Sequence, residues 1–132
     1  MTQKEFTKQC TAAAEPFVER LKAVLPRTDL KLEPQVLKIR LPEMPVGRWV
    51  GVHYAVDDKN GIHASVALPM ECQFTTMDPN GRYAWTRAAM ACGAALLAEE
   101  TAGKIRGILA EYAAVWQRLL AVHRAEEATP KN

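Results

Sequence analysis

The apolar residues at the start of the chain recur at intervals of three and four, which is the spacing of one helix face. Thr2, followed three residues later by Glu5, has the pattern of a capping box, and Pro26 lies beyond the expected helix end. Pro16 lies inside the pattern, which predicts either one kinked helix or two helices with a short break. The expected buried stripe consists of Phe6, Cys10, Ala13, Phe17, Leu21 and Val24.

The apolar period changes to two from Leu30 onwards, which is typical of strands with one buried face. Residues 37–41 alternate between apolar and basic positions and therefore predict a half-buried strand. Pro34 separates this strand from residues 30–33, so we expect these four to form either a separate extended piece or a sheet edge.

Two longer alternating runs, Trp49–Val56 and Ile62–Phe74, predict a hairpin that completes a three-stranded antiparallel meander. The apolar faces of the two strands must coincide, which restricts the register to steps of two residues. A three-residue loop ending at Gly61 places Asp57 directly opposite His63, and this is the register that we favour. A five-residue loop from Asp57 to Gly61 is the competing register.

Residues 82–127 consist almost entirely of good helix formers and are rich in alanine. One straight helix of this span would be about 69 Å long, more than twice the width of a small domain. We expect a break at residues 101–103, where Gly103 weakens the helix and Thr101 can cap the next one. Small residues of the first helix are expected to lie against the sheet, namely Ala88, Ala91, Cys92 and Ala95.

These patterns predict a single α+β domain over residues 1–127, followed by a disordered tail at residues 128–132. It consists of an N-terminal helix, a three-stranded antiparallel meander and two C-terminal alanine-rich helices packed on one sheet face. The length of 132 residues fits one domain. No stretch approaches the roughly 18 uninterrupted apolar residues of a membrane span, and the N-terminus lacks a signal-peptide pattern, so we expect a cytoplasmic protein.

Composition and cysteine usage exclude several classes of function. Seventeen Lys+Arg against fifteen Asp+Glu leave a net charge of +2, far from the footprint of a dedicated nucleic-acid binder. The three cysteines are widely spaced and form no Cys-x-x-Cys motif, so we expect buried thiols rather than disulfides or a zinc site. The sequence has no phosphate loop, dinucleotide fingerprint or nucleophile elbow, and we expect neither a metal nor a cofactor.

The polar side of the predicted hairpin is the first candidate site. Asp57, His63 and Ser65 are expected to lie together there, and an acid, a base and a hydroxyl are the groups used in nucleophilic hydrolysis. No oxyanion hole can be identified, so we interpret this side as a partner-binding surface and keep a small hydrolase as a less favoured alternative. The expected partner-binding residues are Arg40, Arg48, Trp49, His53, Asp57, His63, Glu71 and Gln73.

A basic segment is the second candidate. Between Lys22 and Arg48 the chain has six Lys or Arg and three acidic residues, and Arg82 and Arg87 open the following helix. The order of helix, three strands and alanine-rich helix resembles the double-stranded-RNA-binding domain in topology, although the lysine cluster of such domains is replaced here by residues 82–87. A nucleic-acid-binding module is therefore the alternative function.

The last helix is the third candidate, because its apolar stripe is wider than one sheet face requires. We expect it to contribute to a homodimer through Ile105, Leu109, Tyr112, Trp116 and Leu119. Taken together, the sequence predicts a small non-enzymatic protein-interaction module of the adaptor, chaperone or inhibitor type. It would bind a macromolecular partner, foremost another protein, through the polar hairpin face or the C-terminal helix.

Overall fold

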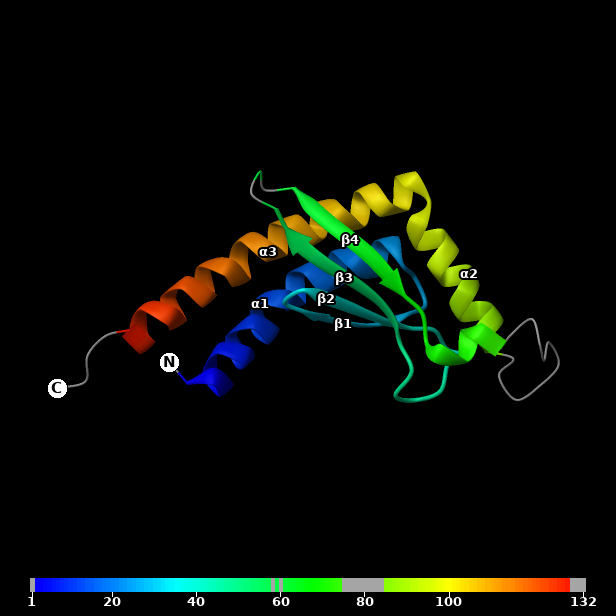
Figure 1. Cartoon of the computed structure of the whole chain (residues 1–132), viewed down its shortest axis with the longest axis horizontal. Helices are drawn as coiled ribbons and strands as arrows, with labels where there is room; N and C mark the ends of the chain where they lie inside the picture. The colour runs from blue at the N-terminus through cyan, green and yellow to red at the C-terminus, as the bar shows by residue number, and fades with distance from the viewer. Residues whose placement is uncertain (1, 58, 60, 75–84, 129–132) are drawn as a thin grey trace.

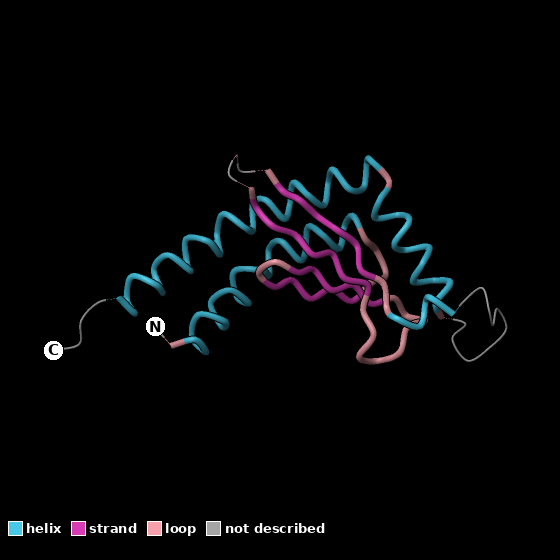
Figure 2. Tube along the Cα trace, viewed as in Figure 1, coloured by secondary structure: helices cyan, strands magenta, loops and turns pink. Residues whose placement is uncertain are grey.

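The structure, a computed structural model, describes residues 2–57, 59, 61–74 and 85–128. Four strands form one antiparallel sheet in the order β1-β2-β3-β4. Helices α1 and α3 lie side by side across one face of this sheet, and α2 closes the end at which β4 terminates (Figure 1, Figure 2). The elements are α1 (Gln3–Val24), β1 (Asp29–Glu33), β2 (Val36–Arg40), β3 (Val50–Val56), β4 (Ile62–Ala67), the 3-10 helix η1 (Met70–Phe74), α2 (Thr86–Leu97) and α3 (Glu99–Ala128).

Helix α1 is a single helix, which decides between the two predictions for its N-terminal segment. The hydroxyl of Thr2 accepts a hydrogen bond from the Glu5 N–H at 3.1 Å and caps the first turn. Pro16 lies inside the helix without ending it, and the last turn closes through a bond from the Leu25 N–H to the Leu21 carbonyl at 2.8 Å. The N-terminal helix is therefore confirmed. The four-stranded antiparallel sheet together with helices α1, α2 and α3 confirms the α+β class.

The sheet has four strands, so the prediction of three was wrong by one. Residues 30–33 belong to β1, which pairs along its whole length with β2 and forms an edge of the sheet. The reversal needs only Pro34 and Gln35, because Gln35 adopts a left-handed conformation with a φ of 71°. A turn this short was not expected, since glutamine has no particular preference for that conformation.

The β3–β4 hairpin adopts the five-residue loop, so the favoured three-residue register was wrong. Val56 pairs with Ile62 rather than with Ala64. The Asp57 carboxylate stabilises the longer loop by accepting hydrogen bonds from the N–H groups of Lys59 at 2.9 Å and Gly61 at 2.7 Å. A Cβ at position 61 would lie 2.9 Å from Asp57 Oδ2, so a side chain there would displace the carboxylate.

Strand β4 ends at Ala67 instead of continuing to Phe74 as predicted. Pro69 follows and lacks the N–H of a strand residue, while its carbonyl accepts a bond from the Cys72 N–H at 3.0 Å. The chain therefore turns into η1, and Glu71 and Gln73 lie on this short helix rather than on the hairpin face.

The two C-terminal helices separate at Ala98, earlier than the predicted break at residues 101–103. Ala98 is extended, with a ψ of 132°, and α3 starts immediately afterwards with Glu99 and Glu100, which favour a helix N-terminus. The packed face of α2 is also shifted from the predicted one. Its buried residues are Thr86, Ala89, Gly93 and Leu96, and the absent side chain of Gly93 lets the helix approach Val66 and Leu68.

Candidate functional site

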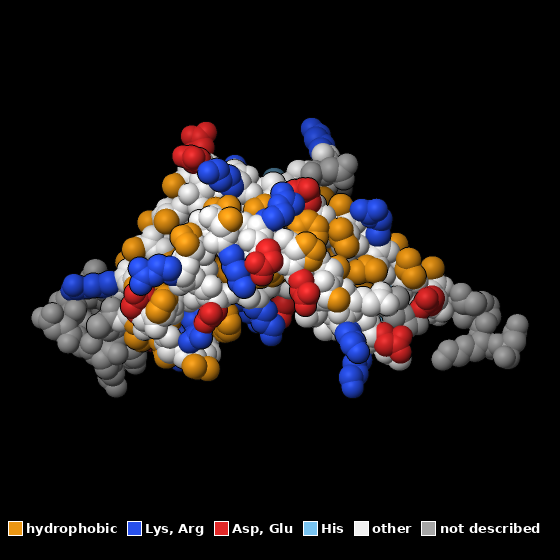
Figure 3. All heavy atoms as spheres, turned by 180° about the vertical axis from the view of Figure 1, so that it is seen from behind, with side chains coloured by type: hydrophobic (Ala, Val, Ile, Leu, Met, Phe, Trp, Pro, Cys, Tyr) orange, Lys and Arg blue, Asp and Glu red, His pale blue; other side chains and the backbone are white. Residues whose placement is uncertain are grey.

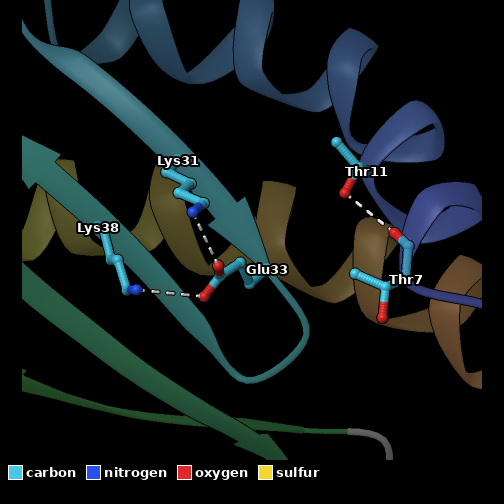
Figure 4. A network of polar contacts seen from close by, with 5 residues as sticks. All are labelled: Thr7, Thr11, Lys31, Glu33 and Lys38. Carbon is cyan, nitrogen blue, oxygen red and sulfur yellow. Dashed lines mark hydrogen bonds and ion pairs between the residues drawn. The ribbon is translucent and has the colours of Figure 1, made fainter. Parts of the chain in front are cut away.

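The open face of the sheet, which none of the described helices covers, divides into two halves of different chemistry. On β1 and β2 the exposed positions carry charges, and these charges are paired with one another. Arg40 forms an ion pair with Asp29, and Glu33 lies between Lys31 and Lys38 with 3.5 Å to each ammonium group (Figure 4). This half is therefore a solvated surface whose charges neutralise one another locally.

The other half, on β3 and β4, has no Lys, Arg, Asp or Glu. Its cross-strand pairs are Gly51 with Ala67, His53 with Ser65 and Ala55 with His63. All of these except Gly51 are exposed, and a shallow hollow of about 450 Å³ lies among Gln35, His53, Ala55, His63 and Ser65. We call these six paired residues the hairpin face. Apart from its two histidines, its side chains are small, and histidine and serine are its only polar side chains.

Asp57 and His63 make contact at the end of the hairpin face even though the predicted register was wrong. His63 Nε2 lies 2.9 Å from Asp57 Oδ2, because the carboxylate in the loop reaches back over β4. Hydrogen bonds from the Gly61 and Lys59 N–H groups and the nearby imidazole of His63 lower the pKa of Asp57, with the Gly61 bond as the main cause. The carboxylate is thus held by the loop that it stabilises.

This group does not have the geometry of a hydrolytic triad. Among the described residues no hydrogen bond joins Ser65 to a histidine, and Ser65 lies opposite His53 rather than His63. The His63 side chain is 77% exposed, so water competes for it, whereas hydrolytic triads work in sites that exclude water. Asp57 and His63 are in contact, and Ser65 lies on the same face as His63 and lines the same hollow without a hydrogen bond to it among the described residues.

Replacing Asp57 by alanine is expected to loosen the hairpin loop and to remove an acid-dependent part of the stability. Because folding lowers the pKa of Asp57, its contribution is present above the unfolded value of about 3.9 and is lost as the pH falls through the folded value. In two-dimensional NMR spectra the Gly61 amide should titrate with a midpoint below that of an unfolded aspartate. A Gly61 amide that does not titrate, or one whose midpoint lies at the ordinary value, would contradict this account.

The remaining predicted partner-binding residues lie away from the hairpin face. Arg48 and Glu71 form an ion pair at 2.5 Å that ties the segment before β3 to η1, and the Arg48 guanidinium lowers the pKa of Glu71. Trp49 is half-buried just before β3, and Gln73 is exposed on η1. Since Arg40 is paired with Asp29, the structure leaves only His53 and His63 of the predicted set on the hairpin face, with Asp57 beside it.

The basic segment does not form a continuous basic surface. Five of its six Lys or Arg residues have an acidic partner in the structure: besides Lys31, Lys38, Arg40 and Arg48, Lys22 lies 3.5 Å from Glu19. Arg87 is exposed on α2, and Arg82 lies outside the described residues. Paired charges repel a phosphate backbone as much as they attract it, so this arrangement does not favour nucleic-acid binding.

The predicted dimer contact lies in the core of the single chain. Ile105, Leu109, Tyr112 and Trp116 are each at most 7% exposed, and Leu119 is partly buried against the same core. The outer side of the helices instead shows basic and acidic side chains interspersed with apolar ones (Figure 3). These five residues are therefore not available for a contact with a second copy of the folded chain.

The described residues include three cysteines and several histidine and acidic side chains of the types that can bind a metal. Within these ranges, no group of three or more His, Cys, Asp or Glu is placed to hold a metal ion. Cys10 and Cys72 are buried and Cys92 is half-buried, and burial raises the pKa of each thiol, which keeps it protonated and unreactive. No helix in the described part of the chain is long and apolar enough to span a membrane.

The free edge of β4 is a structural feature that the sequence interpretation missed. It lies beside a crevice formed with α2 and α3, and Ile62–Ala67 has no charged residue. The sequence alone shows that this segment has no charge. A free edge can be recognised only once the true length of the strand and its place in the sheet are known. No family model, no curated protein and no solved structure matches this chain.

Proposed function

We propose that this protein is a non-enzymatic protein-binding module whose contact surface is the hairpin face. The observation that supports it is the division of the open sheet face, in which one half is covered by paired charges and the other has none. Desolvating paired charges is costly, whereas small uncharged side chains let a partner approach the strands closely. The hairpin face is therefore the half that a protein partner can cover at low cost.

The chemistry of the hairpin face agrees with binding rather than catalysis. His53 and His63 can donate or accept hydrogen bonds, Ser65 adds a hydroxyl, and Ala55 and Ala67 supply apolar contact. Lys, Glu and Asp are depleted in protein interfaces, and the hairpin face has none of them. An adaptor, a chaperone and an inhibitor would all use such a surface.

The arginine variant Ala55→Arg tests the proposal, because it introduces a long charged side chain at the centre of the hairpin face. Tagged protein incubated with a lysate of the source cells should retain a partner, and this substitution should reduce the retained amount by more than about tenfold. Ala12→Arg is the matched control, since Ala12 is exposed on α1, far along the chain from the hairpin. It should retain the partner as the unmodified protein does.

Circular dichroism of both variants establishes that each is folded before capture is compared. Equal capture by the unmodified protein and by Ala55→Arg would show that the hairpin face is not the contact surface. Loss of capture with Ala12→Arg but not with Ala55→Arg would place the surface on the helices instead.

A further inference from the structure

Strand β4 is an edge of the sheet, and its outer side has free backbone hydrogen-bonding groups. In an antiparallel ladder the residues alternate between those bonded to the neighbouring strand and those directed away from it. Tyr54 donates its N–H to the Gln35 carbonyl on the β2 side, so residues 51, 53 and 55 of β3 are directed at β4. Their partners are residues 63, 65 and 67, which leaves the N–H and C=O groups of Ile62, Ala64 and Val66 on the free edge.

The two edges of the sheet differ in how they are protected against strand addition. Natural edge strands commonly carry charges, prolines or bulges that prevent pairing with another chain. Edge strand β1 has three charged residues in five and is followed by Pro34. Edge strand β4 has neither a charged residue nor a proline, and its pairing with β3 runs without a bulge. Within the described residues, β4 is therefore the edge that lacks these protections.

A narrow crevice of about 120 Å³ opens at this edge, between the helix-covered face of the sheet and the α2–α3 corner. Val52, Ala64 and Val66 line it on the helix-covered face of the sheet, and residues of the α2–α3 corner line the other side, namely Leu96, Leu97, Ala102, Ile105 and Arg106. The side chain of Leu97 is 69% exposed there. Arg106 is exposed at the rim and forms no ion pair within the described part of the chain.

We propose that β4 accepts an extended segment of a partner protein, which adds antiparallel to it as a fifth strand. Every second side chain of that segment is apolar, one of these side chains enters the crevice, and a carboxylate near it binds Arg106. The inference rests on the proposed function and specifies the kind of partner. Backbone bonds to Ile62, Ala64 and Val66 supply affinity, while the crevice and Arg106 supply selectivity.

A second copy of this chain fits the site less well than a partner segment. Its own β4 has no carboxylate to place on Arg106. The α2–α3 corner borders the crevice next to β4, so a second copy would bring its own α2–α3 corner close to this one. An isolated extended segment has no such obstacle.

Synthetic peptides of about ten residues that alternate valine and threonine are suitable probes, because this length covers an ordinary strand. One version carries glutamates at its ends and the other lysines. In the intact protein, amide hydrogen exchange at Ile62, Ala64 and Val66 should slow by about tenfold with saturating glutamate peptide. Exchange at residues 63, 65 and 67 should already be slow in the free protein, because their amides are bonded to β3.

N-methylated peptides distinguish strand addition from any other mode of binding. In an antiparallel pair the residues that bond to Ile62, Ala64 and Val66 have their side chains on the same face as these, so they are the valines. N-methylation at the valines should abolish binding, whereas N-methylation at the threonines should leave it. Equal binding of the two methylated peptides would overturn strand addition.

Charge reversal tests the proposed contact between Arg106 and a carboxylate of the partner segment. The glutamate peptide should bind about threefold more tightly than the lysine peptide, the size of a surface ion pair, and Arg106→Glu should reverse this preference. Arg106 is exposed on α3, so the variant is expected to fold. An unchanged preference in this variant would remove Arg106 from the site.

Two further results would overturn the proposal as a whole. If no peptide in this set slows exchange at β4, a partner strand does not bind there. If exchange at Ala64 and Val66 slows with protein concentration in the absence of peptide, a second copy occupies the edge. Loss of partner capture by Ala55→Arg together with unprotected β4 amides would leave the proposed function in place and exclude strand addition alone.

Discussion

Replacing Tyr112 by alanine is expected to lower the free energy of unfolding by about 3–5 kcal/mol, the usual cost of removing a large buried ring. Tyr112 is fully buried in the structure. Its ring centre lies 5.5 Å from that of Phe17, and its hydroxyl donates a hydrogen bond to the Cys10 carbonyl at 3.2 Å. The side chain therefore joins α3 to α1, and its loss leaves a cavity between them.

Urea-induced unfolding followed by circular dichroism measures this effect, and Tyr112→Phe is the matched control. That variant keeps the ring and removes one hydrogen bond, so it should cost only about 1 kcal/mol.

The sequence interpretation placed Tyr112 at a contact between two copies. In that case the unfolding midpoint of the unmodified protein would rise with protein concentration, whereas a residue of the monomer core leaves the midpoint independent of concentration.

Raising the pH above 10 is the second change with a large expected effect. Burial raises the pKa of Tyr54 to about 12, and burial also raises the pKa of Tyr112. Each hydroxyl is already engaged, since Tyr54 donates to the Glu33 carbonyl at 2.9 Å and Tyr112 to the Cys10 carbonyl. The folded chain therefore resists the loss of both protons.

The direction of the effect follows from this difference between the folded and unfolded chain. A tyrosine whose folded pKa exceeds its unfolded value of about 10 stabilises the fold fully below pH 10 and loses that contribution as the pH rises through 12. The expected loss is about 2 kcal/mol for Tyr54 at pH 12. Unfolding free energies measured by denaturant titration from pH 9 to 12 should therefore decline.

The phenylalanine variant of Tyr54 provides the control, because it has no proton to lose. Its stability should be lower at neutral pH by the value of one hydrogen bond, about 1 kcal/mol, and should decline less steeply between pH 10 and 12. If the two proteins decline in parallel, Tyr54 does not contribute to the alkaline loss of stability.

The large elements could be predicted because each depends on side-chain periodicity within its own segment. The spacing of Phe6, Cys10 and Leu21 predicted α1, and all three are buried. Val50, Val52 and Tyr54 are buried on β3, as their alternation predicted. Burial of every third or fourth residue, or of every second one, is a local property that the order of residues expresses directly.

The errors occurred at the connections, where single side-chain contacts decide the path of the chain. Gln35 reverses the chain between β1 and β2, and the Asp57 carboxylate stabilises the longer hairpin loop. Either hairpin register would have buried the same apolar face. The free-energy difference between the two registers therefore came from a few hydrogen bonds that periodicity does not encode.

The candidate site could be predicted only in part, for a related reason. The sequence indicated that His53 and His63 lie on the polar side of the hairpin, and both are exposed there. It placed Glu71 and Gln73 on the same face, although Pro69 directs the chain into η1 before them. It also assigned Tyr112 and Trp116 to an interface, because an apolar stripe has the same spacing whether it contacts the same chain or another.

The sequence by itself determined the α+β fold class, the helix α1, the helical character of the C-terminal segment and the buried faces of β2 and β3, because these follow from local periodicity and composition. Only the tertiary structure decided which strand is an edge, which charges are paired and which apolar residues remain exposed. Those properties depend on contacts between residues far apart in the chain. The paired charges on β1 and β2 and the uncharged edge of β4 are such properties, and both proposals about function depend on them.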